Sequence, residues 1–229
     1  MIKRSLILNT LFLGDNSCHE IIPFQTIDQL ALSTVNFLQV KTVALSGGNT
    51  YSSLFPFWIK LKPDCSGTTF FPVDERIVPF DDPRSNWGTT CRNFLQLIGN
   101  DQDRDNFMTN PEMYRKILFQ KFQQNTPVFD VIFLGVGDDG HTASLFPNTD
   151  DCRDLSSVVL QTKSPKPPYN RITLATKVFI HAKTLITIIR GIEKKEIVKK
   201  MEKADTSLPI VQVLMQCNRS KIYIEEEIL

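Results

Sequence analysis

The sequence predicts an α/β fold in which a mostly parallel sheet carries helices on both faces. Two observations lead to this prediction. Short apolar runs alternate along the chain with segments whose apolar residues recur at helical spacing. No internal repeat, low-complexity segment or linker divides the 229 residues, a length that suits one hydrophobic core. We therefore expect a single domain over residues 1–229, with strands and helices in a Rossmann-like arrangement.

In the first half of the chain, turn-forming residues separate the predicted elements. Apolar spacing predicts strands in the opening MIKRSLILNTLFLG, at 42–46 and at 68–73, and helices at 27–38, 51–55 and 89–98. The opening run is interpreted as a strand and not a signal peptide, because Asn9 and Thr10 interrupt it and no A-x-A site follows. Pro56 is expected to limit or kink the helix before it, because proline has no backbone N–H. The polar stretches 79–86 and 99–106 are expected to be loops, the second one exposed.

The second half of the chain continues the alternation. Apolar spacing predicts helices at 111–124, 192–203 and 208–216, and strands at 129–135, 157–162, 171–176, 184–189 and 221–226. Pro111 suits the first position of its helix, and the run FDVIFLG is the most hydrophobic strand. Ligands of parallel sheets bind in the crevice beyond the carboxyl ends of the strands. The residues that follow each predicted strand are therefore the candidate site.

Composition and charge argue against several classes of function. Lys and Arg number 26 against 25 Asp and Glu, so a net charge of +1 gives no general attraction for nucleic acid or an anionic membrane. No apolar run approaches the ~20 residues of a membrane span. The five cysteines are odd in number and form no C-x-x-C pair, which is typical of reduced thiols. We therefore expect a cytoplasmic protein without a disulfide framework or a metal site.

A glycine loop at 135–140, G-V-G-D-D-G, has the spacing of a dinucleotide-binding loop. NAD binding is not favoured, because Asp138 and Asp139 would repel a pyrophosphate and the helical signal that follows ends by Pro147. The loop suits a turn that presents His141, with Asp139 two residues away to orient it. Imidazole titrates near 6.5 and can take or give a proton at neutral pH. The plainer alternative is that His141 only caps the short helix predicted after it.

Three further segments combine backbone donors or charges at predicted strand ends. They are the glycine turn Ser46-Gly47-Gly48-Asn49, the acidic segment Asp74-Glu75-Arg76 and the proline loop that holds Lys166 and Arg171. The glycine turn offers successive N–H groups before a helix, which suits a phosphate. The two cations of the proline loop, with no acid between them, suit a phosphate monoester. Each segment also has a plainer interpretation, namely an ordinary turn, a surface ion network and a solvated loop.

Longer stretches around these residues match family patterns in order along the chain. They are ALSGGNT, FFPVDERIVPFDDPRSNWG, GVGDDGHTASLFPNT, SPKPPYNRITL and GIEKKEIV. They resemble the S-G-G-[ST]-T, D-E-R-x-V-P … D-x-x-S-N-x-G, G-x-G-x-D-G-H-T-A-S-L-F-P, S-P-K-P-P-x-x-R-[IV]-T-L and G-x-x-K segments of the 6-phosphogluconolactonases. The resemblance extends from about residue 43 to residue 198. Asn49 and Tyr51 depart from the family's usual Ser or Thr and Pro, which leaves the hydrogen bonds of the glycine turn open. Arg190 replaces a typically small residue before Gly191, and no effect is assigned to it.

The resemblance implies hydrolysis of 6-phospho-D-glucono-1,5-lactone to 6-phosphogluconate in the oxidative pentose phosphate pathway, without a metal or an organic cofactor. His141 would be the general base that activates water and would then protonate the leaving ring oxygen. Asp139 and Asp74 would orient His141 or sugar hydroxyls, and Arg76 would stabilise negative charge. Lys166, Arg171 and Arg76 would hold the phosphate. The other substrate-binding residues would be Ser46, Gly47, Gly48, Asn49 and Glu75. The only partner implied is the small sugar-phosphate lactone, with no obligate protein partner.

Two other functions stay open. Amino-sugar-phosphate isomerases/deaminases share the fold and the glycine loop, but they read G-H-I-A-F-N-E-P where this chain reads G-H-T-A-S-L-F-P. Their glutamate falls on Phe146, which cannot relay a proton, and Arg76 stands where they usually have an aromatic residue. The second alternative is a catalytically silent sugar-phosphate sensor, against which the intact His141 and Arg76 argue. Ser144 lacks the G-x-S-x-G setting of a nucleophile, so direct attack by water is expected.

Overall fold

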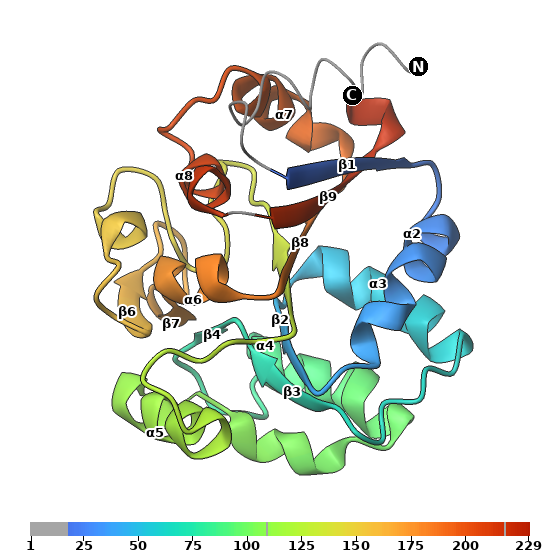
Figure 1. Ribbon diagram of the computed structural model, residues 1–229, viewed down its shortest axis with the longest axis vertical. Helices are drawn as coiled ribbons and strands as arrows, with labels where there is room; N and C mark the ends of the chain where they lie inside the picture. Colours follow the sequence, from blue (N-terminus) through green and yellow to red (C-terminus); the bar gives the residue numbers. More distant parts are fainter. Residues whose placement is uncertain (1–17, 109, 218) are drawn as a thin grey trace.

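The computed structural model describes residues 18–108, 110–217 and 219–229, so the strand predicted in MIKRSLILNTLFLG lies outside the described part. A six-stranded sheet has the order β1-β9-β8-β5-β2-β3, and every pairing in it is parallel (Figure 1). Its strands are β1 (Cys18–Phe24), β2 (Thr42–Leu45), β3 (Thr69–Pro72), β5 (Val131–Gly135), β8 (Thr184–Ile189) and β9 (Arg219–Glu225). The predicted parallel α/β sheet is confirmed, and β1 adds a strand that the sequence did not predict.

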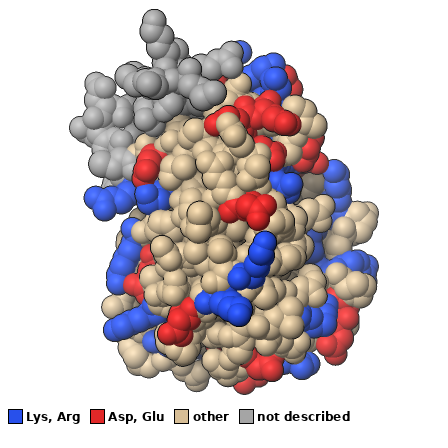
Figure 2. All heavy atoms as spheres, turned by 90° about the vertical axis from the view of Figure 1, so that its right-hand side faces the viewer, with Lys and Arg blue, Asp and Glu red and all other residues tan. Residues whose placement is uncertain are grey.

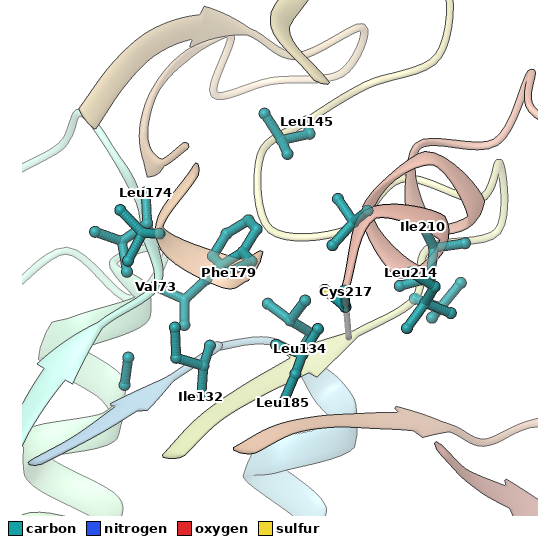
Figure 3. Packing of buried hydrophobic residues seen from close by; sticks show 14 of the residues in the cluster. Val73, Ile132, Leu134, Leu145, Leu174, Phe179, Leu185, Ile210, Leu214 and Cys217 are labelled. Carbon is teal, nitrogen blue, oxygen red and sulfur yellow. The ribbon is translucent and has the colours of Figure 1, made fainter. Parts of the chain in front are cut away.

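Helices pack on both faces of this sheet, and its central strands are apolar on both sides. In β5, Val131 and Phe133 belong to one hydrophobic cluster, whereas Ile132 and Leu134 belong to the other. The first cluster includes side chains from α2 (Ile27–Thr34), α3 (Asn49–Lys60) and α4 (Asn86–Thr90). The second includes side chains from α5 (Pro111–Phe122), α6 (Thr176–His181), α7 (Lys195–Glu202) and α8 (Pro209–Gln216), as part of it shows in Figure 3. The predicted coverage of both faces is confirmed.

A second, three-stranded sheet was not predicted. Its strands β4 (Asp74–Arg76), β7 (Asn170–Leu174) and β6 (Val159–Lys163) are antiparallel and stand in the order β4-β7-β6. The connection between β6 and β7 is too short for the crossover that a parallel pair requires, so the two strands form a hairpin. The predicted strand at 171–176 accordingly ends at Leu174, where α6 soon follows. Ile172 and Leu174 share a hydrophobic cluster with Ile132 of the main sheet.

Helix α3 continues through Pro56 to Lys60, so this proline does not limit the helix, and the alternative of a kink stays a prediction. The lost hydrogen bond and the ring clash cost about 3 kcal/mol in a helix interior. Burial of Tyr51, Phe55 and Trp58 outweighs that cost, since each large apolar side chain contributes about 1.5–3 kcal/mol. The helix predicted at 89–98 is confirmed as a longer helical segment, in which α4 continues through a π-helical turn and a 3₁₀ turn to Ile98.

The polar stretch 99–106 is exposed over most of its length, as predicted, but it is not a loop throughout. It contains a 3₁₀ helix, Asp101–Asn106, that covers the edge strand β3. The buried carboxylate of Asp103 accepts the N–H of Phe70 at 2.7 Å, and the amide of Asn106 donates to the carbonyl of Phe70 at 2.6 Å. An edge strand leaves such backbone groups unpaired unless other parts of the chain bond to them. Asp103 and Asn106 therefore supply hydrogen-bond partners for the backbone of Phe70 at this edge of the sheet.

Basic and acidic side chains are interspersed on the face of the molecule that Figure 2 shows. This mixture agrees with the net charge of +1. Among the described helices, none has the length and apolar character needed to cross a lipid bilayer.

Candidate functional site

A cavity of about 620 Å³ opens at the carboxyl ends of β2, β5 and β8. The chain passes from β2 to β3 on one side and from β5 to β8 on the other, so the sheet reverses its winding between β2 and β5. Crevices at such a switch point are the usual ligand sites of open α/β sheets. The second sheet and the proline loop supply the remaining walls. All the predicted site residues line this cavity except Glu75.

The glycine turn forms the wall at the end of β2 and the start of α3. Gly48 caps α3 with a φ of 89°, a conformation that glycine adopts at little cost. Gly47 lies so close to Asn86 that a Cβ at this position would overlap the Asn86 side chain. Ser46 Oγ is buried and has no hydrogen-bond partner among the described residues. An unpaired hydroxyl beside the free N–H groups of a helix start is suited to an oxygen-rich anion.

His141 is held against the glycine loop by Asp139. Oδ1 of Asp139 lies 2.5 Å from Nδ1 of His141 and also accepts the backbone N–H of His141 at 3.0 Å. The imidazole ring lies directly over Gly137, where any Cβ would overlap it. Glycine at this position is therefore a steric requirement for the orientation of the ring.

No helix follows His141, so the predicted helix start at this point is wrong. Thr142 and Leu145 form a tight bridge instead, and the Thr142 hydroxyl donates to the carbonyl of Gly135 at 2.9 Å. Ala143 between them has a φ of 52°. Leu145 is fully buried in the second hydrophobic cluster, where Figure 3 shows it above Leu134. Core packing thus fixes the loop in a form that local helical spacing did not indicate.

The electrostatics of the Asp139–His141 pair favour one tautomer of the histidine. Partial burial raises the pKa of Asp139, but the hydrogen bond and charge of His141 outweigh burial and lower that pKa to about 2. Asp139 is therefore a carboxylate at neutral pH and can only accept a hydrogen bond. Nδ1 must then carry the proton, which leaves the lone pair of neutral His141 on Nε2. A histidine arranged in this way can remove a proton from water.

Two arginines of the second sheet lie opposite each other in the same cavity. Arg76 on β4 pairs with Arg171 on β7 in the antiparallel register. Their Nε atoms are buried without a hydrogen-bond partner, and neither forms an ion pair within the described part of the chain. Burial and the charge of Arg76 lower the pKa of Arg171, and the charges of Asp74 and Glu75 oppose this shift without reversing it. Like charges across strands are destabilising, so a bound anion would relieve this pair.

Several residues of the cavity wall were not predicted from the sequence. They are Asn86, Ser144, Ser164, Arg190 and Lys194. Lys194 is buried and pairs with Asp138 of the glycine loop. The signal for it was the G-x-x-K pattern of GIEK, which was noted without a role for the lysine. Within the described ranges, no three His, Cys, Asp or Glu side chains are grouped as metal ligands.

The acidic segment divides between the cavity wall and the interior. Asp74 lines the cavity and accepts the hydroxyl of Ser144 at 2.7 Å. Glu75 is fully buried and is not among the residues that line the cavity, so its predicted part in substrate binding stays a prediction. Alternation of side chains along β4 explains the difference, because neighbours in a strand point to opposite faces.

Comparisons with known proteins bear on this site. The family described as glucosamine-6-phosphate isomerases/6-phosphogluconolactonase matches residues 25–223. The putative 6-phosphogluconolactonase of Caenorhabditis elegans is 36% identical over 69% of this chain, and the 6-phosphogluconolactonase of Homo sapiens is 35% identical over 65% of it. The matched parts span only 62% and 61% of those two relatives. The solved structure of 6-phosphogluconolactonase from Trypanosoma brucei is 27% identical, covers 91% of this chain and 96% of its own, and has a TM-score of 0.73.

Proposed function

This chain belongs to the family of glucosamine-6-phosphate isomerases and 6-phosphogluconolactonases, and we propose that within this family it hydrolyses 6-phospho-D-glucono-1,5-lactone to 6-phosphogluconate. The family includes two chemistries, so membership alone does not select one. The observation that carries the proposal is the combination, in one cavity, of the Asp139–His141 pair with two unpaired arginines. The Asp139–His141 pair is equipped for proton transfer, and the two arginines are equipped to bind an anion. Relatives named as 6-phosphogluconolactonases support the same choice.

The proposed reaction starts at Nε2 of His141, which takes a proton from water as the water oxygen attacks the lactone carbonyl carbon. The carbonyl oxygen becomes an oxyanion, and a nearby guanidinium such as that of Arg76 stabilises it. The bond from this carbon to the ring oxygen then breaks, and His141 returns the proton to the ring oxygen. Asp139 stabilises the imidazolium that exists between the two proton transfers. Arg171, Lys166 and the glycine turn bind the phosphate in this proposal, Arg76 also contributes to its binding, and no serine ester forms.

Phe146 favours hydrolysis over the isomerase/deaminase chemistry of the same family. Its ring lies 5.1 Å from the ring of His141, centroid to centroid. An apolar ring at this point can pack against imidazole but cannot accept or relay a proton. Isomerisation of an amino sugar requires an acid at the corresponding position, according to the family pattern given above. The alternative, deamination of glucosamine 6-phosphate, is therefore the second candidate.

A direct assay tests the proposal. Purified protein is mixed with freshly prepared 6-phosphogluconolactone, and formation of 6-phosphogluconate is followed by its oxidation in a coupled reaction. We expect turnover by the wild type, and a kcat at least ~100-fold lower for His141→Ala, because one positioned acid–base group contributes about 10²–10⁴-fold. His181→Ala, at an exposed histidine outside the cavity, is the matched control. Release of ammonia from glucosamine 6-phosphate without lactonase activity would contradict the proposal.

The proposal also includes a cellular compartment and a ligand. Cys65, Cys91, Cys152 and Cys217 are buried and unpaired, which supports a reducing compartment such as the cytoplasm. The proposed ligand is a small sugar-phosphate lactone, and the proposed chemistry needs no metal or organic cofactor, because His141 and Arg76 supply the proton transfer and the charge.

A further inference from the structure

Glu75 lies outside the cavity but between two residues that line it, Asp74 and Arg76. Its carboxylate is fully buried, and both of its oxygens accept hydrogen bonds. The donors are the backbone N–H groups of Arg76 (2.6 Å), Asn86 (2.7 Å) and Trp87 (2.7 Å) and the hydroxyl of Ser85 (2.9 Å). Three of these bonds, from Ser85, Asn86 and Trp87, tie strand β4 to the end of the loop at 77–85 and to the first turn of α4, whereas the bond from Arg76 lies within the strand.

The first consequence of this arrangement concerns the guanidinium of Arg76. Its NH1 donates to the backbone carbonyl of Arg84 at 2.8 Å. Arg84 immediately precedes Ser85, which is bonded to Glu75. The carbonyl that orients Arg76 is therefore connected to the Glu75 carboxylate through Ser85, while the N–H of Arg84 itself donates to Asp82 at 2.8 Å.

The second consequence concerns the glycine turn. The side chain of Asn86 lies in direct contact with Gly47, at a distance that leaves no room for a Cβ. The same side chain donates from Nδ2 to the carbonyl of Asp74 at 3.4 Å. Because the backbone N–H of Asn86 is bonded to Glu75, the position of this asparagine depends on Glu75 as well. One buried carboxylate thus connects the two cavity walls that suit an anion.

We propose that Glu75 is a positioning residue that holds Arg76 and the glycine turn 46–49 in the arrangement that binds the anionic group of the ligand. Burial of a carboxylate is expensive, and packing alone would be served as well by an uncharged side chain. Burial raises the pKa of Glu75 to about 7, against the effect of its hydrogen bonds. The identification of the anion as the substrate's phosphate rests on the proposed function.

Asp103 provides a matched control for Glu75. It is also a buried carboxylate that accepts a backbone N–H, that of Phe70 at 2.7 Å, and burial raises its pKa to about 6. It does not line the cavity, and its hydrogen bond supports the edge strand β3 and not a cavity residue. Glu75→Gln and Asp103→Asn therefore make the same chemical change at two buried sites, only one of which is connected to the cavity walls.

The experiment compares these two variants with the wild type by three measurements. They are the Tm, the KM and kcat for lactone hydrolysis, and the Kd for inorganic phosphate by calorimetry. We expect both variants to lower the Tm. Only Glu75→Gln should raise the KM and the phosphate Kd, by about 10-fold. Its kcat should also fall, because Arg76 stabilises the oxyanion, but by less than that of His141→Ala, because His141 is held separately by Asp139.

Several results would overturn the inference. If Glu75→Gln changes the phosphate Kd no more than Asp103→Asn does, Glu75 is only a stabilising residue. Absence of phosphate binding by the wild type would also overturn it. A wild type that binds phosphate but does not hydrolyse the lactone would contradict the proposed function, while the Kd comparison still decides the role of Glu75. If Glu75→Gln does not fold, Ser85→Ala removes one donor to Glu75, and an unchanged phosphate Kd in that variant would contradict the inference.

Discussion

The two sides of the cavity differ in how their charges are balanced. On the side of β5 and β8, each charged group has a partner of opposite charge: Asp139 with His141, Asp138 with Lys194, and Glu225 with Arg190. On the side of the second sheet, Arg76 and Arg171 face each other without an ion pair among the described residues. The first side is thus electrostatically complete without a ligand, whereas the second is completed by an anion. The difference suggests that chemistry and anion binding are separable by mutation.

The largest effect on activity is expected on the side of β5 and β8, which we call the balanced side because each charge there has a partner. Asp139→Asn keeps the shape of the side chain but removes the charge that fixes the tautomer of His141 and stabilises its cation. We expect kcat to fall by about 10²–10⁴-fold, with KM within a few-fold of the wild type. Steady-state kinetics on the lactone measure both constants. Asp150→Asn, at an exposed aspartate outside the cavity, is the control. A rise in KM at unchanged kcat would place Asp139 in substrate binding instead.

A smaller effect, on substrate binding, is expected on the side of the second sheet, which we call the unbalanced side because its two arginines have no ion pair. Arg171→Ala removes a buried cation with no carboxylate partner, so the folded protein loses no ion pair. We expect KM to rise by about 10–100-fold with little change in kcat, since a hydrogen bond to a charged group contributes about 1.5–3 kcal/mol. The kinetics of Arg115→Ala, at an exposed arginine of α5, control for the loss of a positive charge. If the defect lay only in kcat at saturation, the separation of the two sides would be wrong.

The smallest effect concerns the pH dependence of stability on the balanced side. The folded-state pKa of Asp139, about 2, is below its ordinary value of 3.8, so its contribution is present above pH 3.8 and is lost as the pH falls toward 2. Water screens this half-exposed pair. We expect the Tm of the wild type to exceed that of Asp139→Asn by no more than about 2–4 °C at pH 5, and the difference to vanish near pH 2. Thermal melts across this range measure it, and a difference that grew on acidification would contradict the assigned shift.

The elements that the sequence predicted correctly are those whose pattern is local. The continuous apolar run of β5 is typical of a strand buried on both faces, and the structure places it in the middle of the sheet. Helix α5 begins as expected at Pro111, with the Asn110 side chain accepting the N–H of Met113 at 2.8 Å. The failures at Pro56 and at 99–106 have one cause in common. In both, contacts with distant parts of the chain outweighed local preference.

The sequence by itself determined most of the order of strands and helices, the glycine turn and the turn that presents His141, because periodicity and turn chemistry depend on neighbouring residues. The sequence also identified Arg76 and Arg171 as site residues, but it did not predict that they lie opposite each other. Only the antiparallel register of β4 with β7 brings these two side chains together. Likewise, the sequence did not distinguish Asp74 from Glu75 as cavity and interior residues. That distinction depends on which face of β4 the tertiary structure buries, and the local pattern of three charged residues carries no information about it.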